Sequence, residues 1–225
     1  MKIEVISLGG SVMVPDRVDV AFLNTFKQTL STFKDRRFVI IVGGGKTARN
    51  YIEPLLKSRV NQKDIALIAM AAINLHATFL ARFLGPLASQ TMPTSLKHLK
   101  QLLKKHRVVC VGALHYHKHN TSDGTSAEIA RHLRTRFINI TNIKGLYDKN
   151  PVTSRTATFI PCITYAAFST MINKIPFKLG QHYVLDQRAA KIIQQAKIPT
   201  YIIGKSLKNL EHLLQGKKYV GTIIQ

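Results

Sequence analysis

The chain has 225 residues and a mass of 25.2 kDa, and its 45% hydrophobic content suits one large α/β domain and excludes a disordered protein. Lys and Arg (33) outnumber Asp and Glu (11), which leaves a formal net charge of +22 that attracts polyanions such as nucleotides, nucleic acids or anionic membranes. Two cysteines, Cys110 and Cys162, are too few for a disulfide framework, and both stand in apolar runs. We therefore expect reduced, buried thiols in a cytoplasmic protein. The polar N-terminal segment argues against a signal peptide, and the polar residues inside the longest apolar run, 65–84, argue against a membrane span.

Short runs rich in Val and Ile alternate with helical patterns along the chain. The predicted strands are Ile3–Leu8, Phe38–Val42, Val108–Val111, Phe137–Ile140 and Tyr201–Ile203. The predicted helices cover about 19–34, 46–59, 64–84, 94–106, 125–134 and 186–196. Residues 145–185 are less regular, and we expect a small hairpin and loops there, followed by a late strand at Tyr219–Ile224. This alternation is typical of one compact three-layer α/β/α sandwich with a mostly parallel central sheet.

Two glycine-rich turns directly follow the first two predicted strands. Gly9–Ser11 follows the first strand, and Gly43–Lys46 follows the second and opens a helix that carries Arg49. Glycines let the backbone approach an anion, the start of a helix offers free N–H groups, and an arginine can bind a phosphate with two donors. A tight turn would explain either segment alone, but two such turns after successive strands favour phosphate binding. Neither matches the P-loop or the Rossmann pattern.

A third candidate, Thr141–Pro151, follows the strand Phe137–Ile140. Its threonine and asparagine can hydrogen-bond a base or ribose, and Tyr147 can stack on a purine. A simple glycine turn that ends at Asn150-Pro151 explains the segment equally well.

Acidic residues are scarce, and four of the seven aspartates fall near the expected ligand edge: Asp64, Asp123, Asp148 and Asp186. Asp64 and Asp186 each begin a predicted helix, so an N-cap is an equally good interpretation for both. Phosphoryl transfer, however, needs Mg²⁺ or a positioned lysine, and a few acids to place them. Lys191, in the helix after Asp186, can bind phosphate or simply be solvated.

Two basic segments have plainer interpretations. His115, His117 and His119 alternate, as transition-metal ligands on an extended segment would, but no cysteine or carboxylate spacing supports a metal, so we predict a polar loop and no protein metal site. The lysine-rich helix at about 94–106 is typical of a solvated helix face rather than a nucleic-acid or membrane surface.

Six segments in order, SLGGSV, IVGGGKTARNY, NTSDGTSAEIARHL, ITNIKGLYDKNP, VLDQRAAKII and GTII, resemble the archaeal-type uridylate (UMP) kinases of the amino acid kinase superfamily over nearly the whole chain. The resemblance implies an open α/β/α sandwich in a single domain, with an acceptor (UMP) lobe at about 1–135 and an ATP lobe at about 136–225. It also implies Mg²⁺-dependent phosphorylation of UMP to UDP by ATP in pyrimidine nucleotide biosynthesis, and a homo-oligomer, usually a hexamer built from dimers. Membranes and nucleic acids are not expected as primary partners.

The resemblance, together with the charges around the glycine turns, also assigns roles to residues. The expected catalytic residues are Lys46, Arg49, Asp186 and Lys191. The expected ATP-binding residues are Gly9, Gly10, Ser11, Gly45, Arg49, Thr141, Asn142, Tyr147 and Asn150. The expected UMP-binding residues are Gly44, Asp64, Asn120, Thr121, Ser122 and Asp123.

The chain departs from the family pattern at a few positions. Lys144 replaces the acid of the family's TN-x-D-G element, and Asn150 replaces the acid before Pro151. The long helix has Ala72-Ile73-Asn74 where the family often has an arginine before its asparagine. The family's short UMP loop is longer and remodelled at 113–122. These departures leave two alternatives open: a catalytically weakened nucleotide-binding regulatory homologue, or a kinase for another small acceptor.

Overall fold

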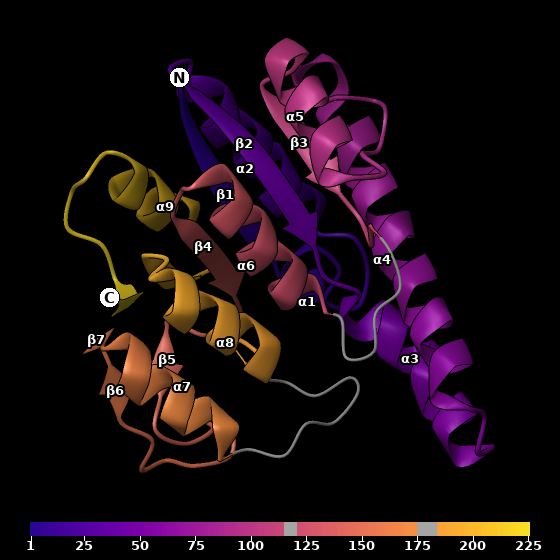
Figure 1. The fold of residues 1–225 in the computed structure, drawn as a ribbon, viewed down its shortest axis with the longest axis vertical. Helices are drawn as coiled ribbons and strands as arrows, with labels where there is room; N and C mark the ends of the chain where they lie inside the picture. Colours follow the sequence, from indigo (N-terminus) through magenta and orange to yellow (C-terminus); the bar gives the residue numbers. More distant parts are fainter. Residues whose placement is uncertain (115–120, 175–183) are drawn as a thin grey trace.

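The computed structural model describes residues 1–114, 121–174 and 184–225 (Figure 1). The strands are β1 (Lys2–Leu8), β2 (Arg36–Val42), β3 (Val108–Val111), β4 (Phe137–Thr141), β5 (Leu146–Tyr147), β6 (Phe159–Ile160), β7 (Cys162–Ile163), β8 (Thr200–Gly204) and β9 (Gly221–Ile224). The helices are α1 (Gly10–Met13), α2 (Val20–Thr32), α3 (Gly45–Lys57), α4 (Gln62–Leu84), the 3₁₀ turn η1 (Gly85–Leu87), α5 (Leu96–Lys105), α6 (Ser122–Leu133), α7 (Tyr165–Asn173), α8 (Gln187–Ala196) and α9 (Leu207–Leu214).

Within the described residues, the central sheet has the order β3-β2-β1-β4-β8-β9-β7. Every neighbouring pair is parallel except β8 and β9, and β5 and β6 form a separate antiparallel hairpin. The central strands are apolar along nearly their whole length because helices cover both faces of the sheet. The predicted three-layer sandwich is thereby confirmed.

The side chains of β1 alternate between the two helical layers. Ile6 and Leu8 pack in a core that includes buried residues of α2, α4 and α9. Val5 belongs to the opposite core, with buried residues of α5, α6, α7 and α8. The carboxyl ends of β1, β2, β3, β4 and β8 therefore emerge together at one edge of the sheet.

Helix α4 serves two purposes in the fold. With η1 it is long and apolar enough to cross a membrane (Gln62–Leu87, mean hydropathy 1.6, 33% of that window buried). Its C-terminal half is part of the core, where Ala77, Leu80 and Leu84 are buried. Its N-terminal half pairs with α3, and Figure 1 shows this α3–α4 hairpin projecting beyond the sheet.

The predicted strands are all present, with boundaries within two residues, and the predicted small hairpin is β5–β6. The lysines of α5 are exposed while Leu99 and Leu103 are buried, which fits the predicted solvated face. Helices α1, α7 and α9 were not predicted, since each is short, and α7 lies in the stretch 145–185 that was predicted to be irregular. The prediction of two buried thiols is wrong for Cys162: it is exposed because β7 is a two-residue edge strand.

Candidate active site at the carboxyl edge of the sheet

The two glycine turns lie against each other at the carboxyl ends of β1 and β2. Gly43 N donates a hydrogen bond to the Leu8 carbonyl (3.0 Å), which ties the second turn to the end of β1. A Cβ atom on Gly10 would lie 2.3 Å from the Gly43 carbonyl oxygen and 2.4 Å from Gly45 N. Only glycine fits at this contact, so the two turns form one continuous wall of backbone, as the sequence predicts.

Arg49 connects the two turns through its side chain. It comes from α3, which begins at Gly45, and its Nη2 donates to Ser11 Oγ on the first turn (3.3 Å). Burial lowers the pKa of the Arg49 guanidinium. The group still stays charged at neutral pH, because the ordinary pKa of arginine is far above 7. Lys46, one turn earlier, is exposed and forms an ion pair with Asp16, whose pKa that lysine lowers.

The starts of α6 and α8 meet beside the glycine wall. Thr121 caps α6 by accepting a hydrogen bond from Gly124 N (3.0 Å), and its hydroxyl also donates to Asp186. Asp186 in turn caps α8 by accepting from Ala189 N (2.8 Å), so its N-cap interpretation is confirmed. Since each helix start carries partial positive charge, both favour an anion at this edge.

Ser122 brings α6 to the second glycine turn. A Cβ atom built on Gly43 would lie 3.5 Å from Ser122 Oγ, so the predicted acceptor segment and the predicted phosphate turns share one site.

Asp123 and Asp186 form a coupled pair of carboxylates behind this edge. Burial and the charge of Asp186 raise the pKa of Asp123 to about 8, although Ser7 Oγ donates to its carboxylate (3.1 Å). Burial also raises the pKa of Asp186, against hydrogen bonds from Thr121 and from the α8 backbone. Two carboxylates in this setting are stabilised by a shared proton or by a cation.

This pair also decides how a metal could be held. Among the described residues, no three His, Cys, Asp or Glu side chains gather as a metal site. Mg²⁺, however, usually keeps several waters and uses one or two carboxylates together with substrate phosphates. The donor set of Asp123 and Asp186 therefore fits an ion carried in with a nucleotide.

His76 was missed by the sequence reasoning, yet it fixes the second glycine turn. It is 3% exposed, with Nδ1 2.9 Å from the Gly43 carbonyl oxygen and Nε2 3.1 Å from Thr47 Oγ1. Two residues earlier on the same helix, the side-chain oxygen of Asn74 accepts from Ala113 N (2.8 Å). The available signal was that Asn74 and His76 are polar positions inside an apolar helix.

The predicted ATP-base residues lie at the end of β4 and in the β5–β6 hairpin. Thr141 ends β4, where its Cα would be 4.0 Å from a Cβ on Gly9, and Asn142 is exposed just beyond. Tyr147 packs edge to face on Phe159 (centroids 5.6 Å apart).

Two neighbouring positions that depart from the family pattern also contribute to the hairpin. Lys144 lies over the ring of Phe159 (5.1 Å), and Asn150 accepts from Val152 N (2.9 Å). These contacts shape the hairpin, and the nucleotide roles of Tyr147 and Asn150 stay predictions.

Two predicted residues make no hydrogen bond or ion pair with the glycine wall among the described residues, and a third lies outside them. Asp64 is exposed in the first turn of α4, where it bonds to Asn61, and Asn61 rather than Asp64 is the N-cap. It precedes Ala69, whose carbonyl oxygen would lie 3.8 Å from a Cβ on Gly44, by five residues, or about 7.5 Å along the helix axis. Lys191 is exposed on α8. Asn120, like His115, His117 and His119, lies outside the described residues.

Residues 2–204 match the model of the amino acid kinase family, and the chain belongs to that family. Its members that resemble this chain are phosphotransferases, and the class agrees with a site built from glycine turns, an arginine and two helix starts.

More particularly, the chain is 31% identical over 221 residues to the uridylate kinase of Thermoplasma acidophilum, covering 98% of this chain and 95% of that one. It is 31% identical over 226 residues to the uridylate kinase of Archaeoglobus fulgidus, with both chains covered completely. The crystal structure of the Archaeoglobus fulgidus uridylate kinase superposes with a TM-score of 0.85 over the whole of both chains, at 30% identity. The UMP kinase structure from Ureaplasma parvum, at 18% identity and a TM-score of 0.80, shares the fold. The resemblance seen in the sequence motifs is thereby confirmed.

Proposed function

We propose that this chain is a UMP kinase, which transfers the γ-phosphoryl group of ATP to UMP and releases UDP and ADP in pyrimidine nucleotide biosynthesis. The observation that carries the proposal is the contact between the two glycine turns, bridged by Arg49 and Ser11, in a chain 31% identical to uridylate kinases over its full length. One wall of backbone can then face both phosphate groups.

The chemistry asks for positioning and charge neutralisation more than for a strong base. The nucleophile is a phosphate oxygen of UMP, which is already ionised at neutral pH, so no proton has to be removed. Arg49 can contact the transferring group with two donors, and the start of α3, which has no side-chain cap, can present N–H groups to phosphate oxygens. The starts of α6 and α8 add partial positive charge at the same edge. Lys46 would add charge from the rim once it exchanges Asp16 for a phosphate.

Mg²⁺, when it arrives with ATP, supplies charge that neutralises the phosphates as they separate. Asp123 and Asp186 are the described carboxylates suited to hold it, because burial raises the pKa of both and a bound cation would offset that effect. UMP binding by Thr121 and Ser122 is proposed on the same placement at the start of α6.

The test is an acceptor panel with labelled ATP and Mg²⁺, comparing UMP with CMP, isopentenyl phosphate and an amino acid, in the wild type and in Arg49→Ala. We expect UMP to be the preferred acceptor and the variant to lose at least 100-fold in kcat/KM, because Arg49, carried by the helix that follows the second turn, places its guanidinium on Ser11 of the first. Nucleotide binding without turnover of any acceptor would instead identify a regulatory homologue. If Arg49→Ala retained the wild-type rate, phosphoryl transfer could not be assigned to the glycine wall.

We also propose that the chain assembles with copies of itself through the α3–α4 hairpin, in the cytoplasm. Large apolar side chains are exposed along this hairpin, among them Tyr51 (63%), Leu75 (61%) and Leu56 (47%). Such a concentration on one projecting element is typical of a protein–protein surface. Analytical ultracentrifugation tests it: a dimer or a hexamer built from dimers is expected, and replacing Tyr51 and Leu75 with Ser should shift the mass towards the monomer.

A further inference from the structure

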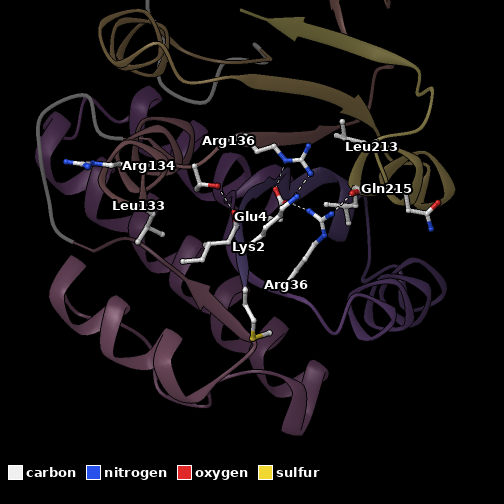
Figure 2. Close-up of a pocket in the computed structure, with 13 residues that line it drawn as sticks. Lys2, Glu4, Arg36, Leu133, Arg134, Arg136, Leu213 and Gln215 are labelled. Carbon is white, nitrogen blue, oxygen red and sulfur yellow. Dashed lines mark hydrogen bonds and ion pairs between the residues drawn. The ribbon is translucent and has the colours of Figure 1, made fainter.

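A second cavity, of about 700 Å³, opens at the opposite edge of the sheet (Figure 2). It lies at the amino ends of β1, β2 and β4 and beside the ends of α6 and α9. It is lined by Met1, Lys2, Ile3, Glu4, Arg36, Leu133, Arg134, Thr135, Arg136, Leu213, Leu214, Gln215 and Gly216. At about 3.3 Å per residue, the length of β1 separates Lys2 from the end of the strand at Leu8 by about 20 Å. The cavity is therefore distinct from the glycine wall.

The floor of the cavity holds two arginines on one carboxylate. Glu4 is 2% exposed and accepts from Arg136 Nε (2.6 Å), from Arg136 Nη2 (2.9 Å) and from Arg36 Nη1. Figure 2 shows the two guanidinium groups on either side of Glu4. One negative charge cannot neutralise two positive ones, so the buried cluster keeps a net charge of +1.

Lys2 and Arg134 add two more positive charges, and neither has an ion-pair partner within the described ranges. The four basic side chains that line the cavity and the single carboxylate of Glu4 thus leave a net charge of +3. The nearest further acid, Asp35, is exposed, lies 3.8 Å from Arg36 Nε and does not line the cavity.

Structural contacts account for only some of the positive side chains in the cavity. Arg36 Nη2 donates to the Leu214 carbonyl (2.5 Å) and so satisfies the C-terminal end of α9. Its Nε is nevertheless buried without a hydrogen-bond partner among the described residues. Among the described residues, Lys2 and Arg134 make no contact of this structural kind, and Figure 2 shows the Arg134 side chain directed away from the arginine pair.

We propose that this cavity binds a phosphorylated anion with two or more linked phosphates, at a site separate from the catalytic edge. A volume of about 700 Å³ is of the size that small-molecule sites occupy. Two guanidinium groups that share one carboxylate keep an attraction for phosphate oxygens, and the exposed Lys2 adds a further positive charge to the lining. The polyanion would compensate the +3 charge that the protein itself leaves unbalanced.

The experiment titrates inorganic tripolyphosphate into the full-length protein by calorimetry, with the catalytic edge filled by UMP and a non-hydrolysable ATP analogue. The test variant combines Lys2→Gln with Arg134→Gln and leaves the buried ion pairs intact. The control combines Lys97→Gln with Lys100→Gln, which removes the same charge from exposed positions on α5. Circular dichroism establishes that both variants are folded, and the thermal midpoint with and without tripolyphosphate gives a second readout of binding.

We expect one saturable site in the wild type and in the control, and an affinity at least tenfold weaker in the Lys2/Arg134 variant, with the ligand-induced rise in midpoint lost as well. Equal weakening in both variants would attribute binding to the overall charge of the protein and overturn the proposal, as would the lack of a saturable site in the wild type. CTP distinguishes the source of the ligand: tighter binding than tripolyphosphate identifies a nucleotide, and equal binding identifies the phosphate chain alone.

Discussion

Replacing Gly10 with alanine tests the contact on which the catalytic edge depends. The added Cβ would meet the Gly43 carbonyl oxygen at 2.3 Å and Gly45 N at 2.4 Å, and both are backbone atoms that cannot rotate away. An ordinary contact begins near 3.4 Å, so the two glycine turns must separate by about 1 Å. Gly204→Ala is the matched control, because its Cβ would lie 3.4 Å from the nearest atom, an ordinary contact.

A displacement of about 1 Å between groups that must align for transfer costs on the order of 100-fold in rate, or about 2.7 kcal/mol of transition-state stabilisation. The strain should also lower the free energy of unfolding by about 1–3 kcal/mol, which for a chain of this size is roughly 2–12 °C in Tm. The loss in rate should therefore persist at temperatures where the variant is fully folded.

The assay is steady-state UDP formation at 25 °C, with Tm measured by calorimetry on the same samples. We expect kcat/KM to fall about 100-fold in Gly10→Ala and less than threefold in Gly204→Ala. A Gly10→Ala enzyme as active as the control would refute the reasoning, since the two turns would then tolerate separation and could not form a single phosphate-binding wall.

Three further outcomes are expected. His76→Ala leaves the buried Gly43 carbonyl without its partner, so urea unfolding should show a loss of about 1–3 kcal/mol together with a raised KM; an unchanged KM would separate His76 from the site. For the nucleotide-free and metal-free protein, the pKa of about 8 for Asp123 lies above its unfolded value of 3.8, so the folded state binds the extra proton between these values and stability falls as pH rises from about 4 to 8. Asp123→Asn should flatten that fall in a urea midpoint series, and a parallel fall in the variant would assign it to other groups. Glu4→Gln leaves the buried Arg36 and the half-buried Arg136 without their carboxylate and should cost about 3–5 kcal/mol in urea unfolding, whereas Glu53→Gln, in an exposed pair, should leave the midpoint unchanged.

The sheet and the meeting of the glycine turns could be predicted because both follow from local patterns. Runs of Val and Ile mark strands buried on both faces, and the carboxyl ends of parallel strands share one edge. Two turns placed after β1 and β2 were therefore bound to lie close, as the contact between Gly10 and Gly43 shows.

The features that could not be predicted from the sequence depend on tertiary contacts and on the lengths of helices, which bring together or separate residues far apart in the chain. Asp64 matches the family motif, and it lies in the first turn of α4, about 7.5 Å along the helix axis before Ala69, which packs against Gly44. The hydrogen bond from Thr121 to Asp186 spans 65 residues. The basic cavity draws on positions from Lys2 to Gly216, so no local spacing announces it.

The pairing of β1 with both β2 and β4 has a mechanical consequence. The predicted acceptor and ATP halves are joined by a backbone ladder that runs from Val5 opposite Phe137 to Leu8 opposite Ile140. Two halves connected in this way cannot open by a hinge motion, because opening would break main-chain hydrogen bonds at the centre of the sheet. Any movement that admits or encloses the two substrates has to come from segments outside the ladder, while the sheet itself stays rigid.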